Sequence, residues 1–265
     1  MLKTEMRNPK TTHIDEMSVH DMVKVINEEN YNAVKAVEDA SPQIEKAINA
    51  VVAGLERGGR LFYVGAGTSG RIGVMDAAEC PPTYGVDKNL VIGIIAGGYG
   101  CMTRAAEQEE DSYEQGVEDV KKYGITANDR VVGVSASGGA AYVIGALEYA
   151  KAQGAVTVGV TSNVSLLSEK ADIAVITDTG AEVVTGSTRM KAGTAQKLVL
   201  NAISTAAMIK TGKVYQNLMI NLKPSNKKLK DRMIRITAEI LGVDNAVAEQ
   251  KLEENGWNIR SAVEK

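Results

Sequence analysis

Glutamate is the residue type best placed for acid–base chemistry in this sequence, and Glu79 is the first candidate. Ile72 and Met75 mark an apolar stripe on a predicted helix, and Glu79 is the next position on that stripe. The following Cys80-Pro81-Pro82 is expected to end the helix, because proline disfavours a helical conformation in the residue before it. The pattern therefore predicts a carboxyl group that faces the protein interior.

A second glutamate interrupts an apolar pattern in the same way. The segment 101–122 is predicted to be helical, and its apolar stripe runs from Ala106 to Tyr113 through Glu110. Burial of a carboxyl group is costly, and it raises the pKa toward the range in which the group transfers protons near neutrality. Neighbouring glutamates fall off the stripe and are typical of a solvated acidic face; these are Glu107, Glu109, Glu114 and Glu118.

Other catalytic groups are scarce. The two histidines, His13 and His20, lie in the N-terminal segment, far along the chain from every glycine-rich turn. A histidine-based triad and a histidine–cysteine zinc site are therefore not expected. Cys80 lies between a glutamate and two prolines, and we interpret it as structural. The sequence predicts a carboxylate mechanism with no metal and no cofactor.

A glycine-rich turn could hold an anionic substrate for these acids. Gly65 to Arg71 follows a predicted strand, matches the Gly-x-Gly-x-x-Gly template and opens a helix. Its Thr68 and Ser69 hydroxyls and its backbone amides at a helix N-terminus suit one phosphate or another small anion. A dinucleotide site is disfavoured, because Ala96-Gly97-Gly98 replaces the acidic residue that such a site needs after the next strand. The alternative is an ordinary tight turn.

Two further polar segments could complete the pocket. Ser135-Ala136-Ser137-Gly138-Gly139 follows another predicted strand and leads into a helix near Ala140. Ligands of open α/β sheets bind at the carboxyl ends of the strands, where this turn and the first one are both expected. Thr185 to Lys191 precedes a long predicted helix, although an ordinary helix cap with a basic first turn explains it equally well.

Five short β-branched runs are predicted to form a parallel sheet that positions these turns. Their apolar character is nearly continuous and helical patterns separate them, which is typical of strands buried on both faces. The predicted strands are 60–64, 90–96, 130–135, 155–161 and 173–177, with helices at 17–40, 42–57 and 188–210. A linker candidate at 223–226 precedes three helical segments, so we divide the chain into a main domain, 1–222, and a small helical domain, 223–265.

Composition narrows the functional classes. The 265 residues carry 30 Lys and Arg against 33 Asp and Glu, and a net charge of −3 provides no strong attraction to nucleic acid or an anionic membrane. Basic residues between Lys223 and Arg235 are interpreted as a solvated helix face, since aromatic stacking platforms are missing. Two cysteines, the absence of a signal-peptide pattern and the short apolar stretches favour a cytoplasmic protein.

Four strings of residues together resemble one family. They are GRLFYVGAGTSGRIGVMDAAECPPTYGV at 59–86, EEDS at 109–112, TGSTRMKAGTAQKLVLNAIST at 185–205 and GKVYQNLM at 212–219. These strings are similar to the N-acetylmuramic acid 6-phosphate etherases, bacterial lyases of the sugar isomerase (SIS) domain superfamily. The similarity covers nearly the whole chain. DAAECPPT and TGSTRMKAGTAQK are specific to this family and its relative, the glucokinase regulatory protein.

The resemblance implies a fold and an activity. The fold is a flavodoxin-like three-layer α/β sandwich with a five-stranded parallel sheet, extended by N-terminal helices and a C-terminal helical appendage. The activity is cleavage of a D-lactyl ether during cell-wall recycling, by a cofactor-free homodimer that binds the sugar phosphate near the subunit interface. Glu79 matches the glutamate of the family's ECPP motif and resembles its general acid. Glu110 matches the glutamate of EDS and resembles the second acid/base.

The substrate is expected on the three polar segments, at Gly67, Thr68, Ser69, Gly70, Arg71, Ser135, Ser137, Gly138, Ser187 and Lys191. One departure affects this set, because Gly139-Ala140-Ala141 stands where the family has Arg-Thr-Pro. The chain also ends earlier than the family pattern, so the appendage is expected to be shortened. Two alternatives stay open: a non-catalytic sugar-phosphate sensor similar to the glucokinase regulatory protein, and an aldose–ketose isomerase on the same fold.

Overall fold

A five-stranded parallel sheet forms the centre of the computed structural model, which describes residues 1–104, 107–224 and 226–263. The strand order is β2-β1-β3-β4-β5, and each predicted strand overlaps one observed strand. Their bounds are β1 (Leu61–Gly65), β2 (Val91–Ile95), β3 (Arg130–Val134), β4 (Val156–Thr161) and β5 (Ile173–Ile176). Every residue of β1, β2 and β3 is buried, which explains the continuous apolar pattern.

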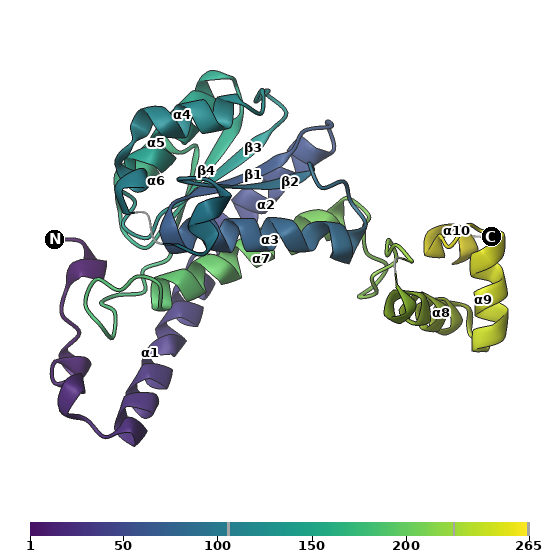
Figure 1. Cartoon of the computed structure of the whole chain (residues 1–265), viewed down its shortest axis with the longest axis horizontal. Coiled ribbons are helices and arrows are strands. Elements are labelled where there is room, and N and C mark those ends of the chain that lie inside the picture. The colour runs from purple at the N-terminus through teal and green to yellow at the C-terminus, as the bar shows by residue number, and fades with distance from the viewer. Residues whose placement is uncertain (105–106, 225, 264–265) are drawn as a thin grey trace.

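Helices cover both faces of the sheet, as Figure 1 shows. One layer holds α2 (Ser41–Leu55), α3 (Gly67–Tyr84) and α7 (Lys191–Lys210), and its core includes Tyr63, Leu200 and Ile203. The other layer holds α4 (Tyr113–Lys121), α5 (Ala141–Ala152) and α6 (Leu166–Lys170), and its core includes Phe62, Tyr142 and Leu147. The expected three-layer α/β sandwich is confirmed.

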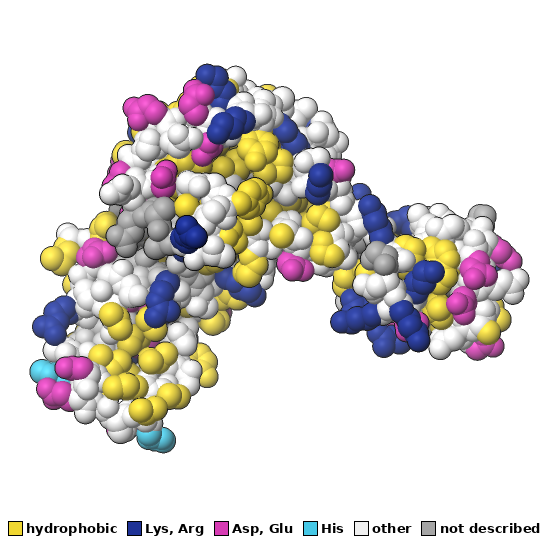
Figure 2. All heavy atoms as spheres, in the orientation of Figure 1, with side chains coloured by type: hydrophobic (Ala, Val, Ile, Leu, Met, Phe, Trp, Pro, Cys, Tyr) yellow, Lys and Arg dark blue, Asp and Glu magenta, His cyan; other side chains and the backbone are white. Residues whose placement is uncertain are grey.

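The N-terminal helix α1 (Val19–Asp39) extends beyond the sheet, and the N-terminal segment folds back beside it (Figure 1). That segment contains the short turns η1 (Lys3–Glu5), η2 (Pro9–Thr11) and η3 (Ile14–Glu16). Apolar side chains gather over α1 in Figure 2, and the exposed ones include Val19, Val23, Tyr31 and Val34, each more than half exposed. Such a face is typical of a surface that another chain covers.

A separate helical unit follows the short bridge between Tyr215 and Leu218. It consists of α8 (Lys227–Leu241), α9 (Asn245–Glu254) and α10 (Ile259–Val263), and Figure 1 shows it apart from the sheet. It has a core of its own, formed by Ile220, Leu222, Met233, Ile236, Leu252, Ile259 and Ala262. The boundary predicted at 223 stays a prediction, and the core of this unit already includes Ile220.

The structure differs from the sequence prediction in the two helices that were expected to carry the glutamates. α3 continues through Pro81 and Pro82 to Tyr84 and ends at Gly85, whose φ of 65° is left-handed. Proline fixes its own φ at a helical value, and the buried Cys80 and Tyr84 hold this last turn against the core. The prediction that Cys80-Pro81-Pro82 ends the helix is therefore wrong.

The predicted helix over 101–122 is also wrong as a single element. The chain forms η4 (Tyr99–Met102) and η5 (Glu107–Asp111), and α4 begins only at Tyr113. Ser112 starts this helix, because its side chain accepts a hydrogen bond from the Gln115 amide at 3.2 Å. Ala106, on which the predicted stripe depended, lies outside the described residues.

A buried ion pair ties α1 to the start of α7. Nζ of Lys191, 1% exposed, donates to Glu29 Oε2 at 2.6 Å, and Lys10 Nζ donates to the other oxygen at 3.0 Å. Asn8 Nδ2 adds a third hydrogen bond at 2.8 Å. Burial alone would raise the pKa of Glu29, but the hydrogen bonds from Lys191, Lys10 and Asn8 lower this pKa to about 2.

We predict that Lys191→Met lowers the free energy of unfolding by about 3 kcal/mol at neutral pH, because it removes the main partner of a buried carboxylate. The double variant Lys191→Met/Glu29→Gln should lose less than the sum of the single variants. Because the folded-state pKa of Glu29 is depressed, its stabilisation is present above the ordinary value of 4.5 and is lost as the pH falls toward 2. Urea unfolding of the wild type and of Glu29→Gln between pH 2 and neutrality tests this dependence. A difference in the free energy of unfolding that does not change with pH would contradict it.

Two glycines allow β1 and the start of α3 to touch. A Cβ on Gly65 would lie 2.6 Å from the Gly70 nitrogen, closer than side chains tolerate. We predict that Gly65→Ala lowers the free energy of unfolding by about 2 kcal/mol, measured by chemical denaturation. The matched control is Gly100→Ala, at an exposed position where a Cβ meets no heavy atom within 4 Å. Equal losses in the two variants would show that the close contact is unimportant.

Candidate functional site

The two glycine-rich turns leave the sheet side by side. β1 pairs with β3 in parallel, with Gly65 opposite Val134, so the segments that follow these strands emerge at the same edge. The strand β2 lies on the other side of β1, and the chain connections therefore diverge between β1 and β3. In open α/β sheets this topological switch point is where ligands bind. The candidate site is the surface between these turns.

The first turn presents backbone amides at the start of α3. The helix begins at Gly67, with φ of 52°, and the preceding Ala66 provides no side-chain cap. Within the described residues no side-chain cap is found for this helix, and the amides of Gly67, Thr68 and Ser69 suit an anion. Ser69 is buried, and its hydroxyl lies 3.0 Å from Gln196 Oε1, so it also joins α3 to α7.

Gly70 and Arg71 have mainly packing contacts in the structure. A Cβ on Gly70 would lie 2.6 Å from the Gly65 oxygen, so only glycine fits between the strand and the helix. Arg71 donates from Nε to the Met102 carbonyl at 3.1 Å and from Nη2 to the Arg104 carbonyl at 2.9 Å. Its guanidinium therefore holds the segment that follows β2, and it supplies positive charge near that segment.

The second turn is fixed by its own serines. Ser135 Oγ accepts from the Gly138 amide at 3.1 Å, and Ser137 Oγ accepts from the Gly139 amide at 3.2 Å. A Cβ on Gly138, with φ of 72°, would lie 1.9 Å from Ser165 Oγ, so this position requires glycine. At Gly139 the nearest atom to an added Cβ is Ser137 Oγ at 3.8 Å. The arginine of the family pattern would therefore have room, and its absence leaves this turn without a cation.

The third segment is largely occupied by internal contacts. Both Glu182 oxygens accept hydrogen bonds at the N-terminus of α7, from the Lys191 amide at 3.1 Å and the Ala192 amide at 2.9 Å. The Lys191 ammonium is bound to Glu29, and the described residues show no contact between it and the glycine-rich turns. Ser187 is partly buried in the turn before the helix. The first two segments thus lie at the same edge of the sheet, whereas the Lys191 ammonium is bound to Glu29.

Glu79 is exposed, so the prediction that it faces the interior is wrong for the single chain. The buried residues of α3 are Ser69, Gly70, Gly73, Asp76, Ala77, Cys80 and Tyr84. The line of Ile72, Met75 and Glu79 lies beside this face, and Met75 is 46% exposed. The helix contacts the sheet mainly through small residues. The apolar Ile72 and Met75 lie beside this contact face, so they gave a wrong prediction for Glu79.

Glu110 is exposed in η5, so its predicted burial is also wrong. It follows β2 and therefore belongs to the same edge of the sheet as the two turns. Glu79 lies ten residues after Ser69, which is about 15 Å along the helix axis. Only a few bonds separate the phosphorus from C3 in a hexose 6-phosphate. A sugar phosphate held at the first turn would therefore have to extend along α3 to meet Glu79 of the same chain.

Sequence reasoning missed the buried acids. Asp76 is 6% exposed and accepts hydrogen bonds from Asn201 Nδ2 at 2.5 Å and Ser204 Oγ at 3.1 Å. Burial, with Asp76 and Glu79 nearby, raises the pKa of the Cys80 thiol to about 12, which agrees with a structural rather than a nucleophilic cysteine. The spacing of Glu29 with the buried Ala33 and Ala36 could have revealed its burial, since these residues share one helix face.

The described residues contain neither a cluster of metal ligands nor a membrane-spanning helix. Within them, no group of three or more His, Cys, Asp or Glu side chains is placed to hold a metal ion. None of their helices is long and apolar enough to span a bilayer.

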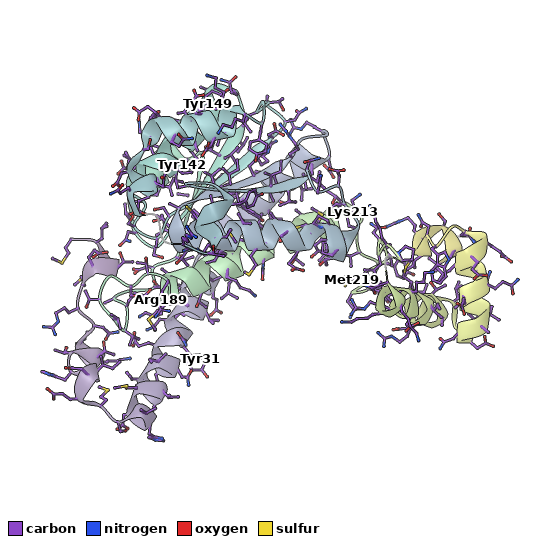
Figure 3. The ribbon with its side chains drawn as sticks, viewed as in Figure 1. Tyr31, Tyr142, Tyr149, Arg189, Lys213 and Met219 are labelled. Carbon is purple, nitrogen blue, oxygen red and sulfur yellow. The ribbon has the colours of Figure 1, made fainter. Side chains whose placement is uncertain are left out.

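A cavity of about 430 Å³ lies beside the Glu29–Lys191 pair, between α1 and the segment after β5. None of the residues that line it belongs to the two glycine-rich turns. Figure 3 shows Arg189 near the upper end of α1 in that view.

Comparisons with known proteins agree with this fold. A family model for the glucokinase regulatory protein N-terminal SIS domain matches residues 43–151, and the SIS domain model matches residues 116–206. Among solved structures, a phosphoheptose isomerase from Francisella tularensis aligns with a TM-score of 0.55 at 19% identity, covering 72% of this chain and 98% of that one. A protein of E. coli CFT073 aligns with a TM-score of 0.53 at 20% identity, covering 76% of this chain and 97% of that one.

Curated relatives show the family. The N-acetylmuramic acid 6-phosphate etherase of Caldanaerobacter subterraneus is 51% identical over 99% of this chain and 86% of its own length. The corresponding proteins of Exiguobacterium sp. and Clostridium beijerinckii are 47% and 51% identical, over 99% of this chain and 90% and 86% of their own lengths. With this similarity over nearly its full length, the chain belongs to the N-acetylmuramic acid 6-phosphate etherase family.

Proposed function

We propose that this protein cleaves the D-lactyl ether of N-acetylmuramic acid 6-phosphate to give N-acetylglucosamine 6-phosphate and D-lactate. The observation that carries the proposal is the 47–51% identity with etherases over 99% of the chain. The sensor and isomerase alternatives are not favoured. The phosphoheptose isomerase structure shares the fold at only 19% identity, whereas the relatives that align over 99% of the chain are named as etherases.

The phosphate is held at the switch point. The free amides at the start of α3 and the hydroxyls of Thr68 and Ser137 provide donors for its oxygens. Gly139 contributes no charge, so backbone amides rather than an arginine carry this contact. Anchoring the phosphate fixes the rest of the open-chain sugar relative to the acids, which lowers the entropic cost of each proton transfer.

The reaction needs two carboxyl groups in opposite protonation states. In the open-chain sugar the aldehyde acidifies the C2 proton, and an ionised carboxylate removes it. The C3–oxygen bond then breaks, and a protonated carboxyl group gives its proton to the departing lactate oxygen. Water adds across the resulting double bond, its hydroxyl to C3 and a proton to C2. Glu79 is assigned as the donor to lactate and Glu110 as the base and the water activator, and the reverse assignment is the alternative.

In a homodimer, Glu79 of one chain could lie close to the first turn of the other chain. The apolar face of α1 is open, and Met75 is exposed next to Glu79 on α3. A second copy that covers these surfaces would carry its own Glu79 toward the partner's switch point and shield both carboxyl groups from water. A cytoplasmic location is part of the proposal, supported by two free cysteines, of which Cys80 is buried.

We predict that Glu79→Gln and Glu110→Gln each lower the rate of D-lactate release by at least about 100-fold, because each removes one proton-transfer group. Sugar-phosphate binding, measured by calorimetry, should be retained, since neither residue anchors the phosphate. Glu118→Gln is the matched control, an exposed glutamate on α4 that should keep wild-type turnover. Wild-type release of lactate by either of the first two variants would refute the assignment.

Mixing the two inactive variants tests where each acid comes from. If a site takes Glu79 from one chain and Glu110 from the other, a heterodimer contains one intact site and one site without either acid. Random re-association should then restore about a quarter of the wild-type activity, because half of the dimers are mixed and half of their sites are intact. No recovery after confirmed subunit exchange would show that one chain supplies both acids.

A further inference from the structure

The first glycine-rich turn lies against the N-terminal half of α7. Ser69 Oγ donates to Gln196 Oε1 at 3.0 Å, and a Cβ added to Gly193 would lie 3.4 Å from Thr68 Cγ2. Gly193 and Gln196 are three residues apart on α7, so they share one face of that helix. One face of α7 therefore supports both hydroxyl-bearing residues of the turn.

Gln196 is a buried side chain that uses only half of its carboxamide. It is 1% exposed, and its Nε2 atom has no hydrogen-bond partner among the described residues. An unpaired buried donor is unfavourable, and an apolar side chain of similar size, such as methionine, would fill this space without that cost. Packing alone therefore does not explain a glutamine behind the first turn.

The bond to Gln196 decides what Ser69 can offer an anion. A serine hydroxyl has one proton, and Ser69 donates it to Gln196 Oε1. The Ser69 oxygen is then only an acceptor, whereas a phosphate dianion has no proton to donate. Ser69 in this arrangement cannot bind the dianion through its side chain.

The carboxamide of Gln196 has a second orientation in the same space. A rotation of 180° exchanges its oxygen and its nitrogen, which are similar in size. Nε2 then donates to Ser69 Oγ, and the Ser69 proton is free for a ligand oxygen. The exchange leaves Oε1 unpaired in place of Nε2, so the number of unpaired carboxamide atoms does not change.

We propose that Gln196 is a positioning residue that converts Ser69 from an acceptor in the free protein into a donor to the bound phosphate. The inference rests on the proposed function, which places the phosphate at the start of α3. A charged acceptor forms the stronger hydrogen bond, so the phosphate draws the Ser69 proton toward itself. The Gln196 amide then replaces the bond that Ser69 gives up. Gln196 acts through Ser69 and does not touch the substrate.

A double-mutant cycle on Ser69 and Gln196 tests this coupling. Calorimetric titration of the full chain with N-acetylglucosamine 6-phosphate gives the Kd. Ser69→Ala and Gln196→Met should each weaken binding about tenfold, the usual effect of losing one hydrogen bond to a charged group. The double variant should bind no more weakly than Ser69→Ala, because no hydroxyl is left for Gln196 to orient. A loss near a hundredfold in the double variant, or an unchanged Kd in either single variant, overturns the proposal.

Ser204→Ala is the matched control for loosened packing between α3 and α7. Ser204 is a buried serine on α7 whose hydroxyl donates to Asp76 on α3 at 3.1 Å. This variant should lower the free energy of unfolding and leave the Kd unchanged. Equal weakening of binding by Ser204→Ala and Gln196→Met overturns the proposal. Gln196→Leu is a second variant without the carboxamide, and it should match Gln196→Met.

Steady-state kinetics separate this inference from the proposed function. With N-acetylmuramic acid 6-phosphate, Gln196→Met should raise KM about tenfold and change kcat less than about twofold, because the phosphate contact is the same before and during the reaction. A fall in kcat at unchanged KM overturns the positioning role. If the wild type releases no lactate, the proposed function fails, and the binding cycle still decides the role of Gln196. If the wild type binds no sugar phosphate, both fail.

Discussion

The parallel pairing of β1 with β3 is the constraint on which the rest of this molecule depends. It places Gly65 opposite Val134, and the two glycine-rich turns consequently share one edge of the sheet. The contact between Gly65 and Gly70 then brings the first turn of α3 against the end of β1. Strand order and two missing side chains thus bring backbone groups of the two turns together at the candidate site.

The elements that could be predicted from the sequence are those with local signals. Runs of buried β-branched residues indicated the strands, and glycines and hydroxyls directly after them indicated the turns. The exposure of Glu79 could not be predicted, because it depends on which line of the helix meets its neighbour, and that of Glu110 could not, because its segment is not one continuous helix. The buried face of α3 includes small residues such as Gly73 and Ala77. A search for large apolar side chains does not identify such residues as the contact face.

The charged residues of the third segment show a second limit of sequence reasoning. A lysine in the first turn of a helix, within a motif predicted to bind substrate, is naturally interpreted as a ligand for phosphate. In the structure Lys191 neutralises Glu29 on a helix 162 positions earlier in the chain, and only the packing of α1 reveals this. Its partner Glu29 is itself only 3% exposed, so the pair fixes the packing of α1 against the start of α7.

The carboxyl group of Glu182 at the N-terminus of α7 has a consequence for how a doubly charged substrate can lie. It accepts hydrogen bonds from two of the amides there, whereas no side-chain cap is found at the start of α3 in the described part of the chain. A molecule that carries a phosphate at one end and a lactyl carboxylate at the other therefore meets one attractive and one repulsive helix terminus. For the proposed substrate, this difference favours a phosphate at the start of α3 over one at the start of α7.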